Sequence, residues 1–266
     1  MSKLPIALTI AGTDPSGGAG VMADLKSFQA RGVYGMAAIT SVVAQNTLGV
    51  QKICNLDLEI FDAQLKSVFD DIPPHALKTG MIPTLEHMEV IEKYLSKEIP
   101  YILDPVMIAT SGDRLIDEKA QTALEQKLLS KATIVTPNIP ETQEIVGFNV
   151  ETEEDIDRAG KIILNEFGSK SVLIKGGHLE TATDYLYIKD GTKKVFTSEK
   201  FQTKHTHGTG CTLSSAITSF IARGLNLVDA IAAAKNYLSQ ALSAGKDVHI
   251  GEGHGPVNHL FNPEKL

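Results

Sequence analysis

The chain has 266 residues and a formal net charge of −7, with 25 Lys and Arg against 32 Asp and Glu. Hydrophobic residues make up 42% and charged residues 21%, a balance that excludes a disordered chain, a collagen-like fibre and a coiled coil. The acidic excess argues against a nucleic-acid or membrane-surface partner, because either would favour a concentrated basic face.

The sequence predicts neither a membrane segment nor a secretion signal. No stretch reaches the roughly 20 apolar residues that cross a bilayer, and the first residues lack a basic region followed by an apolar one. Two cysteines, Cys54 and Cys211, are too few for a disulfide framework in a chain of this length. We therefore expect a reduced, cytoplasmic protein.

Short apolar runs alternate along the chain with longer amphipathic ones. The short runs predict buried strands at 4–11, 36–43, 50–54, 76–78, 102–103, 133–135 and 172–174, with edge or antiparallel strands at 184–188 and 195–201. The amphipathic runs predict helices at 21–30, from Asp57 onward, and at 84–97, 117–129, 152–167, 211–222 and 228–243. This alternation predicts one α/β domain, residues 1–266, whose mostly parallel sheet carries helices on both faces. In such sheets the ligand binds beyond the carboxyl ends of the strands.

The glycine-rich loop 12–20 follows the first predicted strand. It lacks the Gly-Lys-Ser/Thr ending of a P-loop. Residues 18–23 match a relaxed dinucleotide-binding pattern, but no Asp or Glu occurs between residues 25 and 56 to hold a ribose. A tight turn before a helix also accounts for the glycines, whereas Asp14 among them suggests a loop shaped for close approach of a ligand.

A second loop, 206–212, precedes an amphipathic helix. Gly208 and Gly210 allow successive backbone N–H groups to point at one spot, and the helix dipole adds positive potential that suits a phosphoryl group. Cys211 falls in the first helical turn, where a thiol pKa is typically lowered. The thiol is therefore a candidate base or hydrogen-bonding group toward a substrate hydroxyl. The alternative is a small buried residue behind a structural turn.

Oxygen ligands for a metal ion occur at 136–141, where a strand passes into a helix. Asn138 and Glu141 suit Mg²⁺ held partly by waters and phosphates, and they suit a helix-capping box equally well. Asp104 ends another strand and is a second candidate for metal or phosphate contact. Lys175 is a point charge that fits a phosphate.

The histidines of the second loop raise zinc as an alternative. His205 and His207 would project to one side of a strand, with Cys211 nearby. No fourth ligand is identifiable and the intervening residues form a glycine turn, which disfavours zinc.

Seven motifs, taken together and in order, resemble those of a known family. They are AGTDPSGGAG at 11–20, VAQNTLG at 43–49, KTGM at 78–81, DPVM at 104–107, TPNIPE at 136–141, KGGH at 175–178 and HGTGC at 207–211. From residue 4 to about residue 260, ending in the segment 255–259, the chain resembles hydroxymethylpyrimidine/phosphomethylpyrimidine kinases of thiamine biosynthesis, in the ribokinase-like superfamily. The resemblance implies a three-layer α/β/α fold, Mg²⁺ as a cofactor and a homodimer. It also implies ATP-dependent phosphorylation of 4-amino-5-hydroxymethyl-2-methylpyrimidine and then of its monophosphate.

The same resemblance implies roles for individual residues. The residues placed around the transferring phosphoryl group are Gly208, Thr209, Gly210, Cys211 and Lys175. The pyrimidine ring pocket is assigned Gly12, Asp14, Ala19, Met81, Val106 and Met107. Gln45 would read the pyrimidine amino group and ring nitrogen, because a neutral amide both donates and accepts. Thr136, Asn138 and Lys175 are assigned to the nucleotide, and Glu141 and Asp104 to Mg²⁺.

Vitamin B6 (pyridoxal) kinase activity is the main alternative, because such kinases share the fold. Some B6-phosphorylating relatives carry a Cys shortly after Asp-Pro-Val-Met, where this chain has Ala109, and segment 45–47 resembles the pyrimidine subgroup. A non-catalytic vitamin-binding protein and an NAD-dependent enzyme are less favoured, since the phosphoryl-transfer groups are intact and the acidic ribose ligand is missing. Segment 106–116 is the candidate lid.

Overall fold

The computed structural model describes residues 4–107, 118–176, 182–199, 201 and 203–266. Within them the main sheet has the strand order β10-β9-β8-β7-β6-β5-β1-β2. The strands are β1 Ile6–Ala11, β2 Tyr34–Ile39, β5 Ala76–Thr79, β6 Tyr101–Leu103, β7 Ile134–Val135, β8 Ser171–Gly176, β9 Ala182–Ile188 and β10 Lys193–Ser198. From β2 to β8 the neighbours pair in parallel, and β9 and β10 pair antiparallel. The predicted mostly parallel sheet with antiparallel edge strands is confirmed.

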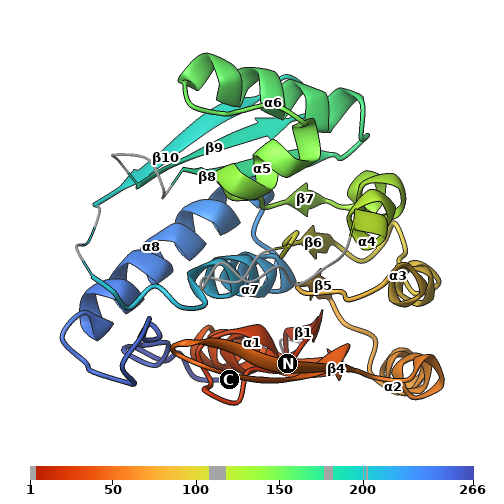
Figure 1. Ribbon diagram of the computed structural model, residues 1–266, viewed down its shortest axis with the longest axis vertical. Helices are drawn as coiled ribbons and strands as arrows, with labels where there is room; N and C mark the ends of the chain where they lie inside the picture. The colour runs from red at the N-terminus through yellow and green to blue at the C-terminus, as the bar shows by residue number, and fades with distance from the viewer. Residues whose placement is uncertain (1–3, 108–117, 177–181, 200, 202) are drawn as a thin grey trace.

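Helices cover both faces of this sheet (Figure 1). One face carries α1 Gly20–Ala30, α7 Thr209–Ala222 and α8 Leu227–Gly245. The other carries α2 Leu58–Asp71, α3 Leu85–Glu92, α4 Glu118–Ala123, α5 Ile139–Val146 and α6 Glu153–Asn165. The contacts follow this division, since α7 packs on β1, β5 and β6 while α2 packs on β2 and α6 on β8 and β9. The expected three-layer α/β/α fold is confirmed.

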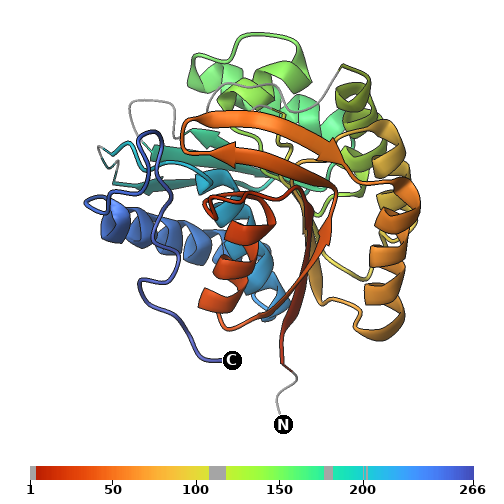
Figure 2. The same ribbon diagram turned by 60° about the horizontal axis from the view of Figure 1, so that its bottom comes forward.

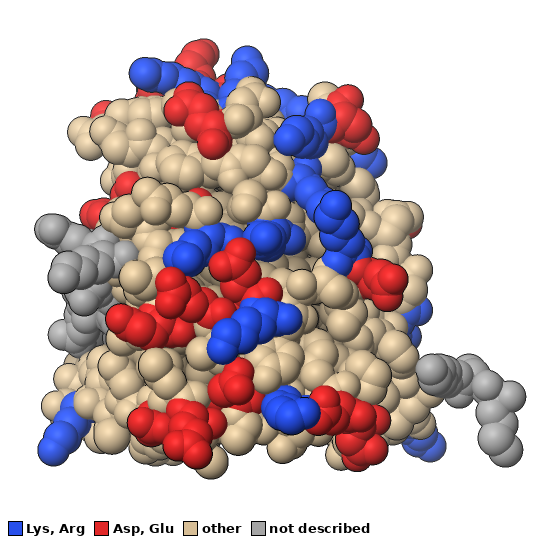
Figure 3. Space-filling model, turned by 90° about the vertical axis from the view of Figure 1, so that its right-hand side faces the viewer, with Lys and Arg blue, Asp and Glu red and all other residues tan. Residues whose placement is uncertain are grey.

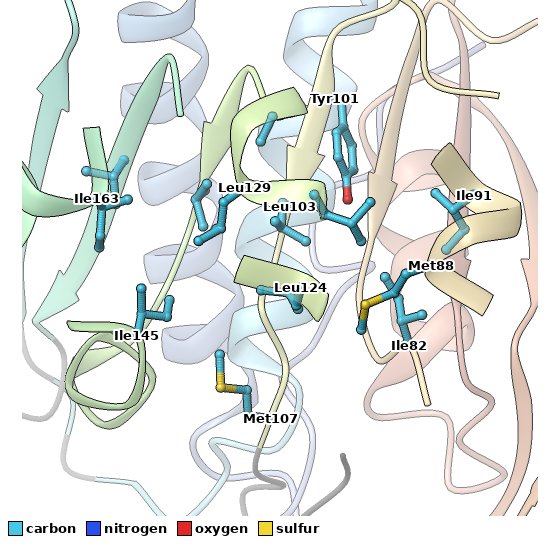
Figure 4. Packing of buried hydrophobic residues seen from close by; sticks show 14 of the residues in the cluster. Ile82, Met88, Ile91, Tyr101, Leu103, Met107, Leu124, Leu129, Ile145 and Ile163 are labelled. Atoms are coloured by element: carbon cyan, nitrogen blue, oxygen red, sulfur yellow. The ribbon is translucent and has the colours of Figure 1, made fainter. Parts of the chain in front are cut away.

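The alternation of side chains along the central strands explains why both faces need helices. In β6, Tyr101 and Leu103 belong to the apolar cluster of the α2–α6 layer, whereas Ile102 belongs to the cluster under α7 and α8. Successive side chains of a strand point to opposite faces, so a strand that is apolar throughout requires cover on both sides. Figure 4 shows this packing, in which Leu124 and Leu129 lie over β6.

The predicted strand 36–43 is wrong as a single element. The chain turns at Thr40, after which β3 Ser41–Asn46 leaves the main sheet and pairs antiparallel with β4 Gly49–Asn55. At Thr40 the backbone N–H still donates to Ala11 O (3.0 Å), while the hydroxyl donates to Met81 O (2.9 Å). The resulting β3–β4 hairpin crosses the sheet edge above β1 (Figure 2), and one of its faces is exposed.

Local capping signals fix several helix boundaries. Asp57 caps α2 as predicted, accepting the Glu59 N–H at 2.8 Å. The predicted helix at 117–129 is α4 followed by a π-helical stretch, Leu124–Leu128, and a 3₁₀ turn, Leu129–Lys131. Of the candidate lid, residues 108–116 lie outside the described residues, as does Ala109.

The face that carries α2, α3 and α4 mixes charges of both signs (Figure 3). Ion pairs on it include Lys66–Asp70, Lys127–Glu89 and Lys131–Glu92. Among the described helices, none combines the length and the hydropathy that crossing a membrane requires.

Candidate active site

A cavity of about 290 Å³ lies beyond the carboxyl ends of the parallel strands. Ala11 ends β1, Gly80 follows β5, Asp104 follows β6 and Lys175 lies near the end of β8, and all four line the cavity. The sequence placed the ligand at this edge of the sheet, and the cavity lies there.

Most residues assigned by resemblance line this one cavity. They are Gly12, Ala19, Gln45, Met81, Asp104, Val106, Asn138, Glu141, Lys175, Gly208, Thr209, Gly210 and Cys211. Asp14, Met107 and Thr136 do not belong to its lining. All three are buried, and Met107 packs into the apolar core of the α2–α6 layer instead (Figure 4).

Asp14 shapes the first glycine-rich loop from beneath. Its Oδ2 accepts the backbone N–H groups of Ala19 (2.7 Å) and Gly18 (3.1 Å), and its Oδ1 accepts that of Ser16 (2.9 Å). Oδ2 also lies 2.7 Å from Nε2 of His207 in the second glycine-rich loop. Burial alone would raise the pKa of Asp14, but the hydrogen bonds from His207 and Ser16 lower it. The expected role of Asp14 as a pocket-lining residue is corrected: it holds the two loops together.

The first turn of α7 faces the cavity with Thr209, Gly210 and Cys211. Gly208 is the N-cap, with φ of +73°, and no side chain caps this helix end. The first-turn N–H groups of a helix lack intrahelical partners, so this turn offers donors and positive potential to an anion. A Cβ on Gly210 would lie 3.3 Å from Lys175 Nζ, so the turn sits directly beside that ammonium group.

Lys175 and Asp104 form a buried ion pair, with Nζ 3.0 Å from Oδ1. Thr136 donates its hydroxyl to Oδ1 of Asp104 (3.1 Å), and Ser214 of α7 donates to Oδ2 (3.1 Å). Burial alone would raise the pKa of Asp104, but the charges of Lys175 and Lys78 lower it. Asp104 is therefore ionised, and three side-chain donors surround it. Thr136 serves this carboxylate rather than lining the cavity.

Asn138 and Glu141 form the capping box that the sequence offered as one of two readings. The Asn138 side chain accepts the Glu141 N–H (2.8 Å), and Glu141 Oε2 accepts the Asn138 N–H (2.9 Å). Burial and the nearby charge of Asp104 raise the pKa of Glu141 to about 7, although Lys175 opposes the rise. Two buried carboxyls beside one ammonium group leave uncompensated negative charge when both ionise. Their oxygens fit the hard donors that Mg²⁺ prefers.

The predicted lowering of the Cys211 pKa is wrong. Burial raises the pKa of this thiol to about 12, and the charge of Lys78 offsets only part of the rise. Cys211 lies in the cavity wall and is only partly exposed, and there the loss of hydration outweighs the effect of the helix N-terminus. At neutral pH Cys211 is a protonated thiol.

A second buried ion pair, which the sequence analysis missed, lies behind the cavity. Lys78 Nζ is 2.8 Å from Asp24 Oδ1, and both side chains are fully buried. The hydroxyls of Thr9 and Ser215 donate to the same carboxylate. A lysine inside a strand that is predicted to be buried is the signal that could have pointed to such a partner.

Zinc gains no support from the geometry of the second loop. His207 is held by Asp14, and 206–207 belongs to no strand that would align it with His205. Among the described residues, no group of three or more His, Cys, Asp or Glu side chains is arranged to hold a metal ion. Any Mg²⁺ here would therefore take most of its ligands from waters and phosphates.

A family model, phosphomethylpyrimidine kinase, matches residues 14–258. The chain belongs to this family. In this chain a helix N-terminus, a lysine and two carboxyls line one cavity. The chain is accordingly a kinase, a phosphotransferase of the hydroxymethylpyrimidine/phosphomethylpyrimidine class.

Three individual relatives are all vitamin kinases, and two of the three are pyrimidine kinases. A hydroxymethylpyrimidine/phosphomethylpyrimidine kinase from Staphylococcus aureus (strain MRSA252) is 54% identical over 265 residues, covering 98% of this chain and 95% of the relative. A crystal structure of phosphomethylpyrimidine kinase from Clostridium difficile has a TM-score of 0.79 at 44% identity, covering 89% of this kinase and 99% of that chain. Pyridoxal kinase from Staphylococcus aureus in complex with AMP-PCP, an ATP analogue, has a TM-score of 0.88 at 33% identity, covering 97% and 94%.

Proposed function

We propose that this kinase transfers the γ-phosphoryl group of ATP to the hydroxyl of 4-amino-5-hydroxymethyl-2-methylpyrimidine and then to the phosphate of the product. One observation carries the proposal: a single cavity is lined both by Gln45 and by the first turn of α7 with Lys175. Gln45 supplies an amide for a pyrimidine edge. The turn and the ammonium group supply the charge that phosphoryl transfer needs.

At the acceptor end, apolar groups and one amide are proposed to orient the ring. A Cβ on Gly12 would meet Met81 Sδ at 3.4 Å and Val43 Cγ2 at 3.5 Å, so the absence of a side chain leaves a slot between them. Gln45 Nε2 lies 3.5 Å from Thr13 O, a weak contact that leaves the amide available to a ligand. Orientation of this kind supplies much of the rate, because it replaces an encounter in solution.

At the donor end, the N–H groups of Gly210 and Cys211 are proposed to donate hydrogen bonds to the equatorial oxygens of the transferring phosphoryl group. Lys175 adds a fixed positive charge beside this turn, 3.3 Å from where a Gly210 Cβ would lie. Phosphoryl transfer depends mainly on alignment and charge stabilisation, so this device needs no covalent step on the protein. Asn138 and Thr136 act here as supports for Glu141 and Asp104.

The residues present fit Mg²⁺, and Glu141 with Asp104 would hold it through waters and substrate phosphates. Mg²⁺ supplies neutralisation of phosphate charge when bound. Asp104 already accepts hydrogen bonds from Lys175, Thr136 and Ser214. Glu141, whose pKa is raised to about 7, is therefore the carboxyl whose protonation would change when Mg²⁺ binds.

Cys211 is proposed to contact the acceptor as a neutral thiol rather than as a base. A thiol with a pKa of about 12 holds its proton at neutral pH and can donate it in a hydrogen bond. The second phosphorylation uses an acceptor phosphate that is already ionised, so it requires no base.

We also propose that residues 1–266 form one domain and that the kinase is a cytoplasmic homodimer. One continuous sheet from β2 to β10 supports the single domain. The exposed apolar side chains Val42 and Leu48 on the β3–β4 hairpin favour association. Light scattering coupled to size-exclusion chromatography tests the dimer.

ADP release measured separately with hydroxymethylpyrimidine, its monophosphate and pyridoxal tests the function. Strong turnover with both pyrimidines and little with pyridoxal is expected. Pyridoxal kinase is the second candidate, because solved pyridoxal kinases cover 97% of the chain at 33–37% identity. A preference for pyridoxal would overturn the pyrimidine assignment while leaving the phosphoryl-transfer site in place.

A further inference from the structure

The segment 254–259 follows α8 and returns to the first turn of α7, and none of its residues lines the cavity. Figure 2 shows the chain after α8 passing the β3–β4 hairpin and α1 on its way to the C-terminus. His254 N donates to Thr47 O (2.9 Å) in that hairpin, and Gly255 O accepts the His207 N–H (3.1 Å). The segment therefore contacts two of the loops that frame the active site.

One side chain of this segment, His259, reaches the N-cap of α7 through a hydroxyl. Thr212 Oγ1 donates to Gly208 O (2.8 Å) and lies 3.0 Å from His259 Nε2. A hydroxyl has one proton; with that proton on Gly208 O, the nearer of the two atoms, His259 Nε2–H is the donor to Thr212. His259 is 4% exposed, and its buried ring lies in the neutral form.

This chain of hydrogen bonds ends on the carbonyl group that begins the phosphate-binding turn. Gly208 O also accepts the Thr212 backbone N–H at 2.8 Å, so two donors of one residue orient it. Gly208 has no side chain that could fix the turn. Its φ of +73° is a left-handed conformation, which glycine adopts readily but which its own flexibility does not hold in place. The same peptide carries the Thr209 N–H, which donates to Thr206 O at 3.3 Å, so bonds at both ends fix the peptide from which the N–H groups of Gly210 and Cys211 follow.

His259 is itself held firmly. Its carbonyl oxygen accepts the Tyr237 hydroxyl of α8 at 2.8 Å, and the Asn258 N–H donates to Ala241 O at 3.2 Å. The backbone that carries the ring is thus anchored to α8, while Nε2 of the ring reaches Thr212 of α7. An anchored donor restrains its acceptor more than a mobile one does, because less conformational entropy remains to be lost.

We propose that His259 is a positioning residue that orders the phosphate-binding turn of α7 through Thr212 and Gly208. It touches neither substrate nor nucleotide. The inference rests on the proposed phosphoryl-transfer role of that turn, whichever acceptor the kinase prefers. Loss of the donor should lower kcat and leave the KM for the acceptor nearly unchanged, because the ring pocket lies elsewhere in the cavity.

A matched pair of substitutions tests the donor. Gln and Met have nearly the same shape, but only Gln keeps an N–H group at the position of Nε2. We expect His259→Gln to stay within about twofold of the wild-type kcat and His259→Met to fall about fivefold to tenfold, the effect of one net hydrogen bond, with the acceptor KM within about twofold in both. An equal kcat for the two variants, or a loss confined to KM, would overturn the proposal.

A second pair keeps the test decisive if changes at His259 prevent folding. Thr212→Ser retains the hydroxyl, whereas Thr212→Val removes it at constant shape. Thr212→Val should lower kcat about tenfold and Thr212→Ser about twofold or less. Equal kcat values for the two variants would overturn the proposed link from His259 through Thr212 to Gly208. ADP release is measured with whichever acceptor the wild type turns over fastest, so an error in the proposed substrate shows in the wild type and an error in the proposed link shows in the variants.

Discussion

A Cβ atom on Gly208 would lie 1.8 Å from the carbonyl oxygen of Gly18, so the two glycine-rich loops touch backbone to backbone. The Asp14–His207 hydrogen bond, 2.7 Å long, joins the same two loops through their side chains. One loop leads into α1 and the other leads into α7, and residues of both line the cavity. The distance between the two loops therefore sets the width of the cavity at the end where α7 begins.

We predict that Gly208→Ala disables the kinase. The new Cβ would meet Gly18 O and force the loops apart, in addition to the left-handed backbone strain of about 1–2 kcal/mol. Gly147→Ala is the matched control, because Gly147 has the same kind of backbone, φ of +74°, and nothing within 4 Å of its Cβ position. Both variants should lower the melting temperature, but only Gly208→Ala should lower kcat by about a hundredfold or more. Equal kcat values for the two would contradict the loop contact.

Gln45→Leu should weaken binding of the pyrimidine and leave the nucleotide unaffected. Removing an amide that pairs with a buried ring edge costs about 1–3 kcal/mol, which raises the acceptor KM about tenfold to a hundredfold. The KM for ATP should stay within about twofold, because the phosphate end of the cavity is untouched. Gln45→Glu is the shape-matched control and should retain more of the affinity than Leu. A Leu variant with wild-type KM would remove Gln45 from the specificity site.

Periodicity predicted the order of strands and helices well, because the central strands are apolar on both faces and their helices carry capping residues such as Asp57 and Asn138. It failed at Thr40, where the apolar run continues but the chain changes sheets. Run length alone does not reveal which hydrogen-bond partners a residue finds, and Thr40 finds Ala11 and Met81 far along the chain.

The types of residue in the motifs predicted which residues lie in the site better than they predicted the pKa values and burial of those residues. Cys211 was expected to be acidic from its place in the helix, yet its burial dominates. Asp14 and Met107 were expected in the lining because they sit in the right motifs. Burial and side-chain direction depend on the packed chain, so neither the Asp14–His207 bond nor the Lys78–Asp24 pair was visible in the spacing.

Lys175→Met should lower kcat far more than it weakens binding of the acceptor. The substitution removes the charge beside the proposed phosphate-binding turn and leaves Asp104 buried without its partner at 3.0 Å. We expect kcat to fall about a hundredfold or more and the melting temperature to fall as well, since breaking a buried pair is costly. Lys193→Met removes a lysine from the exposed Lys193–Asp157 pair and should leave kcat unchanged. A Lys175 variant with kcat near that of this control would exclude Lys175 from the site.

The pH dependence of stability should report the state of Glu141. Its pKa is raised from 4.5 to about 7, so between these values the folded chain keeps a proton that the unfolded chain has released. This group therefore makes stability fall as pH rises from about 4.5 to 7, with the full penalty present above pH 7. Glu141→Gln keeps an acceptor for the capping box and removes the titration.

Thermal unfolding of wild type and Glu141→Gln across this range checks the sign. The variant should gain melting temperature relative to wild type as pH rises. His259, whose pKa is lowered to about 4, contributes in the opposite direction but equally in both proteins. Mg²⁺ should stabilise the wild type more above pH 7 than near pH 5, because it binds the ionised carboxyl. A difference between the proteins that does not change with pH would refute the raised pKa.

Cys211 should behave as an inert, protonated thiol in both labelling and kinetics. With a pKa of about 12, the fraction of thiolate at neutral pH is negligible, whereas Cys54 is exposed. Iodoacetamide should modify Cys54 first, and a Cys54→Ser variant should label slowly until it unfolds. Cys211→Ser should keep kcat within about threefold, since a hydroxyl also donates and accepts a hydrogen bond. Rapid labelling of the Cys54→Ser variant, blocked by the pyrimidine, would instead mean that Cys211 is an activated thiolate at the acceptor end of the cavity.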